Sequence, residues 1–214
     1  WRVITYDERG WGQTSHQGEF TYWDLAEDLL SLMDFLEVEK AVLVGMSQGG
    51  FLSMRAALLQ PDRVEALVLV DSEGSALADD EKALYKSLHE AMLESGMAGP
   101  LGETLASFLF APGYQGVEFW RAKWNSRNPQ LWADATECLF ERDDIDDRLP
   151  EIKCPTLVIH GDSDASIPLE RGKRMAELLG GETQFIVIEG AGHTPNLEKP
   201  AMVNPILLDF LASL

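Results

Sequence analysis

The chain has 214 residues, of which 17 are Lys or Arg and 36 are Asp or Glu, so its formal net charge is −19. This length suits one domain, or one domain with an insertion, and the 45% of hydrophobic residues is typical of a globular protein. Nucleic acids and anionic membrane surfaces would repel so acidic a chain, and no apolar run approaches the roughly 20 residues that cross a bilayer. We therefore expect a small-molecule substrate as partner, and neither nucleic acid nor membrane.

The two cysteines, Cys138 and Cys154, are too few for a disulfide framework. Neither has a histidine or a second cysteine at the spacing of metal ligands. Reduced thiols are typical of intracellular proteins, so we expect a cytoplasmic protein. No residue pattern indicates a metal or another cofactor.

In the first 73 residues, short apolar runs alternate with segments of helical periodicity. The predicted strands are 2–6, 41–44 and 66–70, and the predicted helices are 22–35 and 50–59. This alternation is typical of a parallel sheet with helices on its faces. The sequence therefore predicts an α/β protein with a mostly parallel, doubly wound sheet.

The alternation stops between residue 74 and about residue 150, where no strand is predicted. The predicted helices there are 79–95, 101–110, 117–125 and 130–140. Large apolar residues occur throughout, among them Met92, Phe110, Trp120, Trp124 and Trp132. We expect a mostly helical cap over the active site, with some of Met92, Phe110, Trp120 and Trp124 lining an apolar pocket.

Strands and helices alternate again in the last part of the chain. The predicted strands are 156–159 and 185–188, and the predicted helices are 169–179 and 201–211. The domain organisation that follows is a core formed by residues 1–73 and 151–214, with residues 74–150 inserted as a helical cap.

The candidate nucleophile is Ser47, in the sequence Gly-Met-Ser-Gln-Gly at 45–49. This Gly-x-Ser-x-Gly pattern directly follows a predicted strand and precedes a predicted helix, where a sharp turn would expose the hydroxyl and needs small neighbours. The helix N-terminus would direct free N–H groups, including that of Gln48, at a developing oxyanion. We therefore expect the Gln48 backbone N–H to be an oxyanion donor.

A serine needs a base and the base needs an orienting carboxylate. Among the four histidines, His193 is the candidate base, because it follows the last predicted strand in a glycine-rich loop. Three aspartates are candidates for the acid, each after a predicted strand: Asp71, Asp162 and Asp164. The order Ser47, Asp164, His193 matches the Ser…Asp…His order of one fold among the common triads.

Four segments resemble the α/β-hydrolase superfamily, in the branch with a helical cap. They are Tyr6–Thr14, similar to the family's YDxRGxGxS segment, then Gly45–Gly50, Pro155–Asp164 with Pro168, and Gly190–Pro200. The resemblance covers nearly the whole chain and implies an α/β-hydrolase fold. It also implies that Asp164, three residues after Gly161, is the acid and that Asp162 forms a turn. The overall pattern is faintly similar to enol-lactonase-like members.

The chain departs from that family at its start. Members begin with further strands and a His-Gly-rich loop that completes the oxyanion hole. The strand expected at 2–6 resembles the family's fourth strand. In the family's sheet, the third strand lies between this fourth strand and the next one, which 41–44 resembles. Without it, these two strands would leave a gap in the sheet. We therefore expect an N-terminally incomplete fold, completed by an upstream segment of about 40–80 residues or by a separate chain.

Together these residues predict a serine hydrolase of small carboxylic esters or lactones that forms an acyl-enzyme. The same triad would support cofactor-free perhydrolysis, as in a haloperoxidase, or hydrolysis of a C–C bond. A reading of another class is a non-catalytic binding protein or an incomplete fragment on this fold, because fold alone does not fix function.

Overall fold

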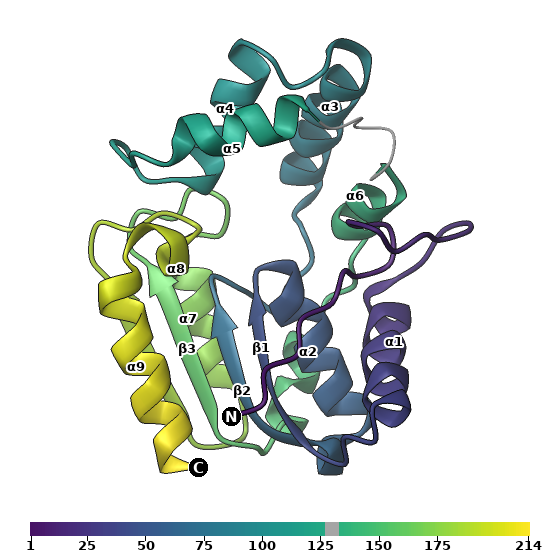
Figure 1. Cartoon of the computed structure of the whole chain (residues 1–214), viewed down its shortest axis with the longest axis vertical. Coiled ribbons are helices and arrows are strands. Elements are labelled where there is room, and N and C mark those ends of the chain that lie inside the picture. Colours follow the sequence, from purple (N-terminus) through teal and green to yellow (C-terminus); the bar gives the residue numbers. More distant parts are fainter. Residues whose placement is uncertain (127–132) are drawn as a thin grey trace.

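The computed structural model describes residues 1–126 and 133–214, and a four-stranded parallel sheet forms its centre (Figure 1). The strands are β1 (Ala41–Met46), β2 (Val64–Val70), β3 (Thr156–Gly161) and β4 (Thr183–Ile188), in the order β1-β2-β3-β4. Each neighbouring pair is parallel, so all four carboxyl ends lie at one edge of the sheet. The predicted parallel sheet is thereby confirmed.

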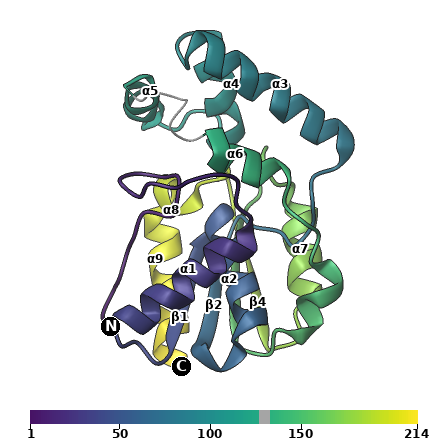
Figure 2. The same cartoon turned by 90° about the vertical axis from the view of Figure 1, so that its right-hand side faces the viewer.

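Helices cover both faces of the sheet, as expected of a doubly wound fold (Figures 1 and 2). On one face, α1 (Tyr22–Phe35), α2 (Gln48–Leu59) and α7 (Leu169–Leu178) pack on side chains such as Leu67 and Leu69. On the other face, α9 (Pro200–Ser213) packs on Val68 and Leu157. Because successive side chains of a strand point to opposite faces, the continuous apolar run of β2 serves both layers.

Three short helical elements complete this part of the fold. They are the 3₁₀ helices η1 (Pro61–Arg63) and η3 (Asp146–Glu151), and the α-helix α8 (Pro195–Glu198). The last of these directly follows the loop that carries His193.

The predicted strand at residues 2–6 is wrong, because residues 1–8 form no strand. Trp1 is 72% exposed and Val3 81% exposed, and a cavity of about 380 Å³ lies between this segment and β1. A strand needs a neighbour to pair its backbone groups, and no described strand lies beside residues 2–6.

Helices form the segment after β2. They are α3 (Asp79–Ser95), α4 (Pro100–Leu109), α5 (Val117–Asn125) and α6 (Ala133–Phe140), and they lie beyond the carboxyl ends of the strands (Figures 1 and 2). Between residues 74 and 150 the described part of the chain contains no strand, as predicted. Trp132 and the start of the helix predicted at 130–140 lie outside the described residues. Within the described ranges, no helix has the length and apolar character needed to cross a membrane.

Candidate active site

Ser47 lies at a strained turn between β1 and α2. Its backbone has φ 50° and ψ −112°, a conformation that non-glycine residues seldom adopt. A Cβ at Gly45 would collide with the backbone of Gly49, whereas a Cβ at Gly49 would meet open space. The close approach that requires a glycine is therefore at Gly45. The turn raises the Ser47 side chain at the carboxyl edge of the sheet.

Gln48 is the first residue of α2. The Ser47 carbonyl accepts hydrogen bonds from the N–H groups of Gly50, at 2.9 Å, and Phe51, at 3.2 Å. The N–H of Gln48 has no acceptor among the described residues, as is usual for the first N–H groups of a helix. The Gln48 side chain is held aside, because the Tyr22 hydroxyl donates a hydrogen bond to its Oε1 at 2.9 Å.

Asp164 and His193 form a buried hydrogen-bonded pair. His193 Nδ1 lies 2.8 Å from Asp164 Oδ2. Asp164 Oδ1 accepts hydrogen bonds from the N–H groups of Ser166, at 2.8 Å, and Ile167, at 3.0 Å. Burial by itself raises the pKa of Asp164, but the hydrogen bond and charge of His193, together with the Ile167 N–H, outweigh it, and the pKa is lowered. An ionised carboxylate can only accept a hydrogen bond, so it favours the His193 tautomer that has its hydrogen on Nδ1.

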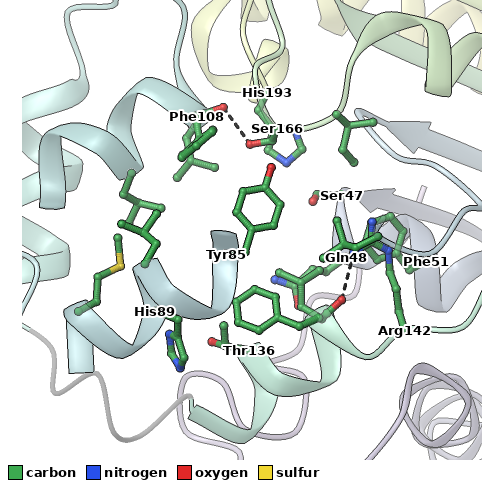
Figure 3. A pocket seen from close by; sticks show the side chains of 18 of the residues that line it. Ser47, Gln48, Phe51, Tyr85, His89, Phe108, Thr136, Arg142, Ser166 and His193 are labelled. Carbon is green, nitrogen blue, oxygen red and sulfur yellow. Dashed lines mark hydrogen bonds between the residues drawn. The ribbon is translucent and has the colours of Figure 1, made fainter. Parts of the chain in front are cut away.

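Ser47 and His193 line one cavity of about 350 Å³ between the sheet edge and the helices α3–α6. Figure 3 shows the Ser47 hydroxyl and the His193 ring among the side chains that line this cavity. Ser47 follows β1, Asp164 follows β3 and His193 follows β4. The parallel sheet thus brings together three residues that are distant in the sequence.

Most of the cavity wall is apolar. Its aliphatic, sulfur-containing and aromatic residues include Leu77, Met92, Leu105, Phe108, Trp124 and Phe140. Met92 and Trp124 line the cavity as predicted, but Phe110 and Trp120 do not. Phe110 stacks on the ring of Trp124 with the ring centroids 6.1 Å apart, and Trp120 packs against Phe119 at 5.6 Å. Phe110, at the end of α4, therefore packs α4 against α5, whereas the Trp120 contact lies within α5 itself.

One buried ion pair lies in the wall, and no sequence motif indicated it. Arg142 Nη2 is 2.6 Å from Glu73 Oε1, and the two side chains are 3% and 1% exposed. Arg142 also donates hydrogen bonds to the carbonyl oxygens of Ser75 and Leu139, each at 3.1 Å. The positive charge at this wall is thus neutralised by Glu73.

The remaining histidines have separate roles. His160 is fully buried, and burial lowers its pKa. Its Nε2 donates a hydrogen bond to the carbonyl of Ile167 at 2.9 Å and thereby supports the loop that carries Asp164. His16 Nε2 lies within hydrogen-bond distance of Asp134 Oδ2, at 2.6 Å. His89 lines the cavity, and sequence reasoning missed it because helical spacing alone did not show which face of α3 looks toward Ser47.

Glu198, in α8, connects the His193 loop to the segment between α4 and α5. Its Oε1 accepts from the Gly192 N–H at 3.0 Å and from the Thr194 hydroxyl at 3.1 Å. Its Oε2 accepts from the Ala111 N–H at 2.9 Å. One carboxylate therefore fixes the residues on both sides of His193.

Replacement of this carboxylate should affect both stability and activity. We expect Glu198→Ala to lower the free energy of unfolding by about 1–3 kcal/mol, because donors at the Ala111 and Gly192 backbone lose their acceptor. Denaturant unfolding and kcat, each measured beside the exposed control Glu189→Ala, check this. Equal effects of the two substitutions would contradict it.

The architecture and the strained serine turn together define an α/β hydrolase, and comparison with known proteins agrees. Residues 1–200 match the family model of the alpha/beta hydrolase fold, and the chain belongs to this family of enzymes. The resemblance drawn from its motifs is thereby confirmed.

Three known proteins illustrate the family relationship. A candidate non-heme chloroperoxidase of Synechocystis sp. is 30% identical over 236 residues, which cover 99% of this chain and 81% of that protein. The 3-oxoadipate enol-lactonase 1 of Acinetobacter baylyi is 27% identical over 229 residues, which cover 100% and 80%. The structure of a thermophilic esterase from Thermogutta terrifontis is similar with a TM-score of 0.86 and 31% identity, over 97% of this chain and 78% of that one.

Proposed function

We propose that the protein is a serine hydrolase that cleaves small carboxylic esters or lactones. The observation that carries the proposal is the 2.8 Å hydrogen bond between His193 and Asp164, in a cavity that Ser47 shares. A base, its orienting carboxylate and a hydroxyl on a strained turn are the three parts that nucleophilic acyl transfer requires. The esterase and the enol-lactonase among the similar proteins support the same class of substrate.

In the proposed reaction, Ser47 Oγ forms a bond to the carbonyl carbon and its proton passes to His193 Nε2. The carbonyl oxygen becomes an oxyanion that accepts a hydrogen bond from the Gln48 N–H. When the intermediate collapses, the bond to the leaving oxygen breaks and this oxygen takes the proton from His193. Water then repeats the sequence on the acyl-enzyme and releases the acid.

We further propose that residues 74–150 act as a cap inserted between the two parts of the core, 1–73 and 151–214. Residues from α3, α4, α5 and α6 line the cavity that contains Ser47. Such a cap would exclude water and select the substituents of the substrate.

The cavity favours neutral esters over carboxylate-bearing ones. The Arg142 side chain is already neutralised by Glu73, so a substrate carboxylate would enter a largely apolar space without a free cation among the described lining residues. We expect kcat/KM for p-nitrophenyl butyrate to exceed that for the mono-p-nitrophenyl ester of succinic acid by about tenfold or more, as about 1.4 kcal/mol of differential binding would give. Equal or reversed values would contradict this. Glu73→Gln removes the charge that neutralises Arg142, so it should lower the ratio of kcat/KM for the neutral ester to kcat/KM for the carboxylate-bearing ester.

A second candidate function is cofactor-free perhydrolysis, favoured by the similarity to the candidate chloroperoxidase. In this reaction hydrogen peroxide replaces water in the attack on an acyl-enzyme, so that a peracid leaves. Peracid formation from acetate and hydrogen peroxide, measured against the rate of ester hydrolysis, separates the two activities.

Hydrolysis of p-nitrophenyl acetate, with and without a fluorophosphonate probe, tests the proposal. We expect turnover, its loss on labelling, and covalent modification of Ser47 detected by mass spectrometry. A folded protein that neither turns over esters nor reacts with the probe would instead agree with a binding protein on this fold.

A further inference from the structure

Asp71 is a second buried carboxyl group beside the Asp164–His193 pair. It follows β2 directly, has a positive φ of 44° and is fully buried. Its Oδ1 accepts a hydrogen bond from the Gly161 N–H at 2.9 Å. Its Oδ2 is also buried, and no hydrogen-bond partner of this oxygen is found among the described residues.

Two carboxyl groups meet at this point. One polar atom each from Asp71, Asp164 and His193 lie within 4.8 Å of one another. The other titratable groups near Asp71 are His160 and Glu198. His160 Nε2 is 3.8 Å from Asp71 Oδ1 and donates instead to the Ile167 carbonyl, while Glu198 adds negative charge. No group described here therefore supplies Asp71 Oδ2 with a hydrogen.

Only one of the two carboxyl groups has surroundings that favour ionisation. Asp164 has His193 and two backbone N–H groups as donors, whereas Asp71 has a single N–H. Burial, and next the negative charge of Asp164, raise the pKa of Asp71 far above its ordinary value. Like charges so close in a protein interior repel, and one of the pair then holds the proton.

We propose that Asp71 is a positioning residue that stays protonated at neutral pH and donates a hydrogen bond from its carboxyl group to the Asp164 carboxylate. The hydrogen then lies between the orphaned Oδ2 and Asp164 and satisfies both. Asp164 then receives this hydrogen bond in addition to those from the Ser166 and Ile167 N–H groups while it orients His193. This role rests on the proposed function in one respect: it assumes that His193 is the catalytic base.

Activity tests the proposal through a conservative variant. Asp71→Ala removes the donor and should lower kcat/KM by about tenfold or more, as the loss of one buried hydrogen bond to a charged group would give. Asp71→Asn keeps an acceptor for Gly161 and offers an amide hydrogen to Asp164, so it should recover most of that loss. The acid limb of the pH profile of kcat/KM should stay in place in Asp71→Asn, because no charge is removed beside His193. An ionised Asp71 gives the opposite result: Asp71→Asn would be as inactive as Asp71→Ala, and its acid limb would move to lower pH.

A measurement of thermal stability tests the proposal without an activity assay. Its outcome therefore does not depend on whether the proposed hydrolase function is correct. A carboxyl group whose pKa is raised by folding contributes most below its unfolded pKa of about 3.9. As the pH rises above that value, the unfolded chain releases a proton that the folded protein retains, and stability is lost. Asp71→Asn has no such proton, so the Tm of this variant minus the Tm of the wild type should rise steadily between pH 5 and pH 8. The exposed Asp162→Asn is the matched control and should show no such trend. A Tm difference for Asp71→Asn that does not change with pH would overturn the proposal.

Discussion

Ser47→Ala should lower kcat for ester hydrolysis by about 10⁴-fold or more while KM changes little, because the nucleophile acts in the transition state and not in ground-state binding. The substitution removes one oxygen from a turn whose strain belongs to the backbone, so the fold should be retained. Steady-state kinetics with p-nitrophenyl acetate, beside a Tm measurement, check both statements.

The matched control is Ser163→Ala, since Ser163 is exposed on the loop of Asp164 and does not line the cavity. It should keep nearly all activity. Should Ser47→Ala retain more than about a tenth of the wild-type kcat, acyl transfer through Ser47 would have to be abandoned as the mechanism.

Asp164→Asn should be the most damaging of three Asp→Asn substitutions, with a loss in kcat of about 10⁴-fold. An asparagine amide facing His193 Nδ1 would donate a hydrogen where the carboxylate accepts one. The ring would then carry its hydrogen on Nε2, and this nitrogen could no longer take the proton of Ser47.

The comparison is with Asp162→Asn and Asp71→Asn under the same conditions. Asp162 is exposed and accepts hydrogen bonds from the Ser163 hydroxyl and the Gly190 N–H, so it should behave as the turn former that the motif implied. If Asp71→Asn proved the most damaging, the orienting carboxylate would be Asp71 and not Asp164.

Much of the sheet and of the site could be predicted because both depend on local patterns. A strand, a turn of defined residues and a helix follow one another around Ser47, and the loops with Asp164 and His193 directly follow strands. In a parallel sheet all such loops meet at one edge, so the three residues could be placed together without knowing any distance.

The parts that could not be predicted depend on contacts between distant segments. Residues 2–6 have the apolar pattern of a strand, but a strand exists only beside a partner. The pairing of Glu73 with Arg142 joins residues 69 positions apart. Likewise, only two of the four apolar residues named for the pocket line it, because spacing along a helix does not show which neighbour each face meets.

The direct pairing of β2 with β3 has a consequence for how this chain can change over evolutionary time. The two strands are neighbours in the sheet, with Val70 opposite Ile159, although the whole helical segment intervenes between them in the sequence. The entropy of closing such an excursion grows only slowly, by about 0.6 kcal/mol for each doubling of its length. Insertions and deletions between α3 and α6 would therefore cost the sheet little, while Ser47, Asp164 and His193 stay attached to strand ends that do not move. If the proposed cap and triad hold, the helical segment could diverge in sequence and length while the positions of Ser47, Asp164 and His193 are preserved.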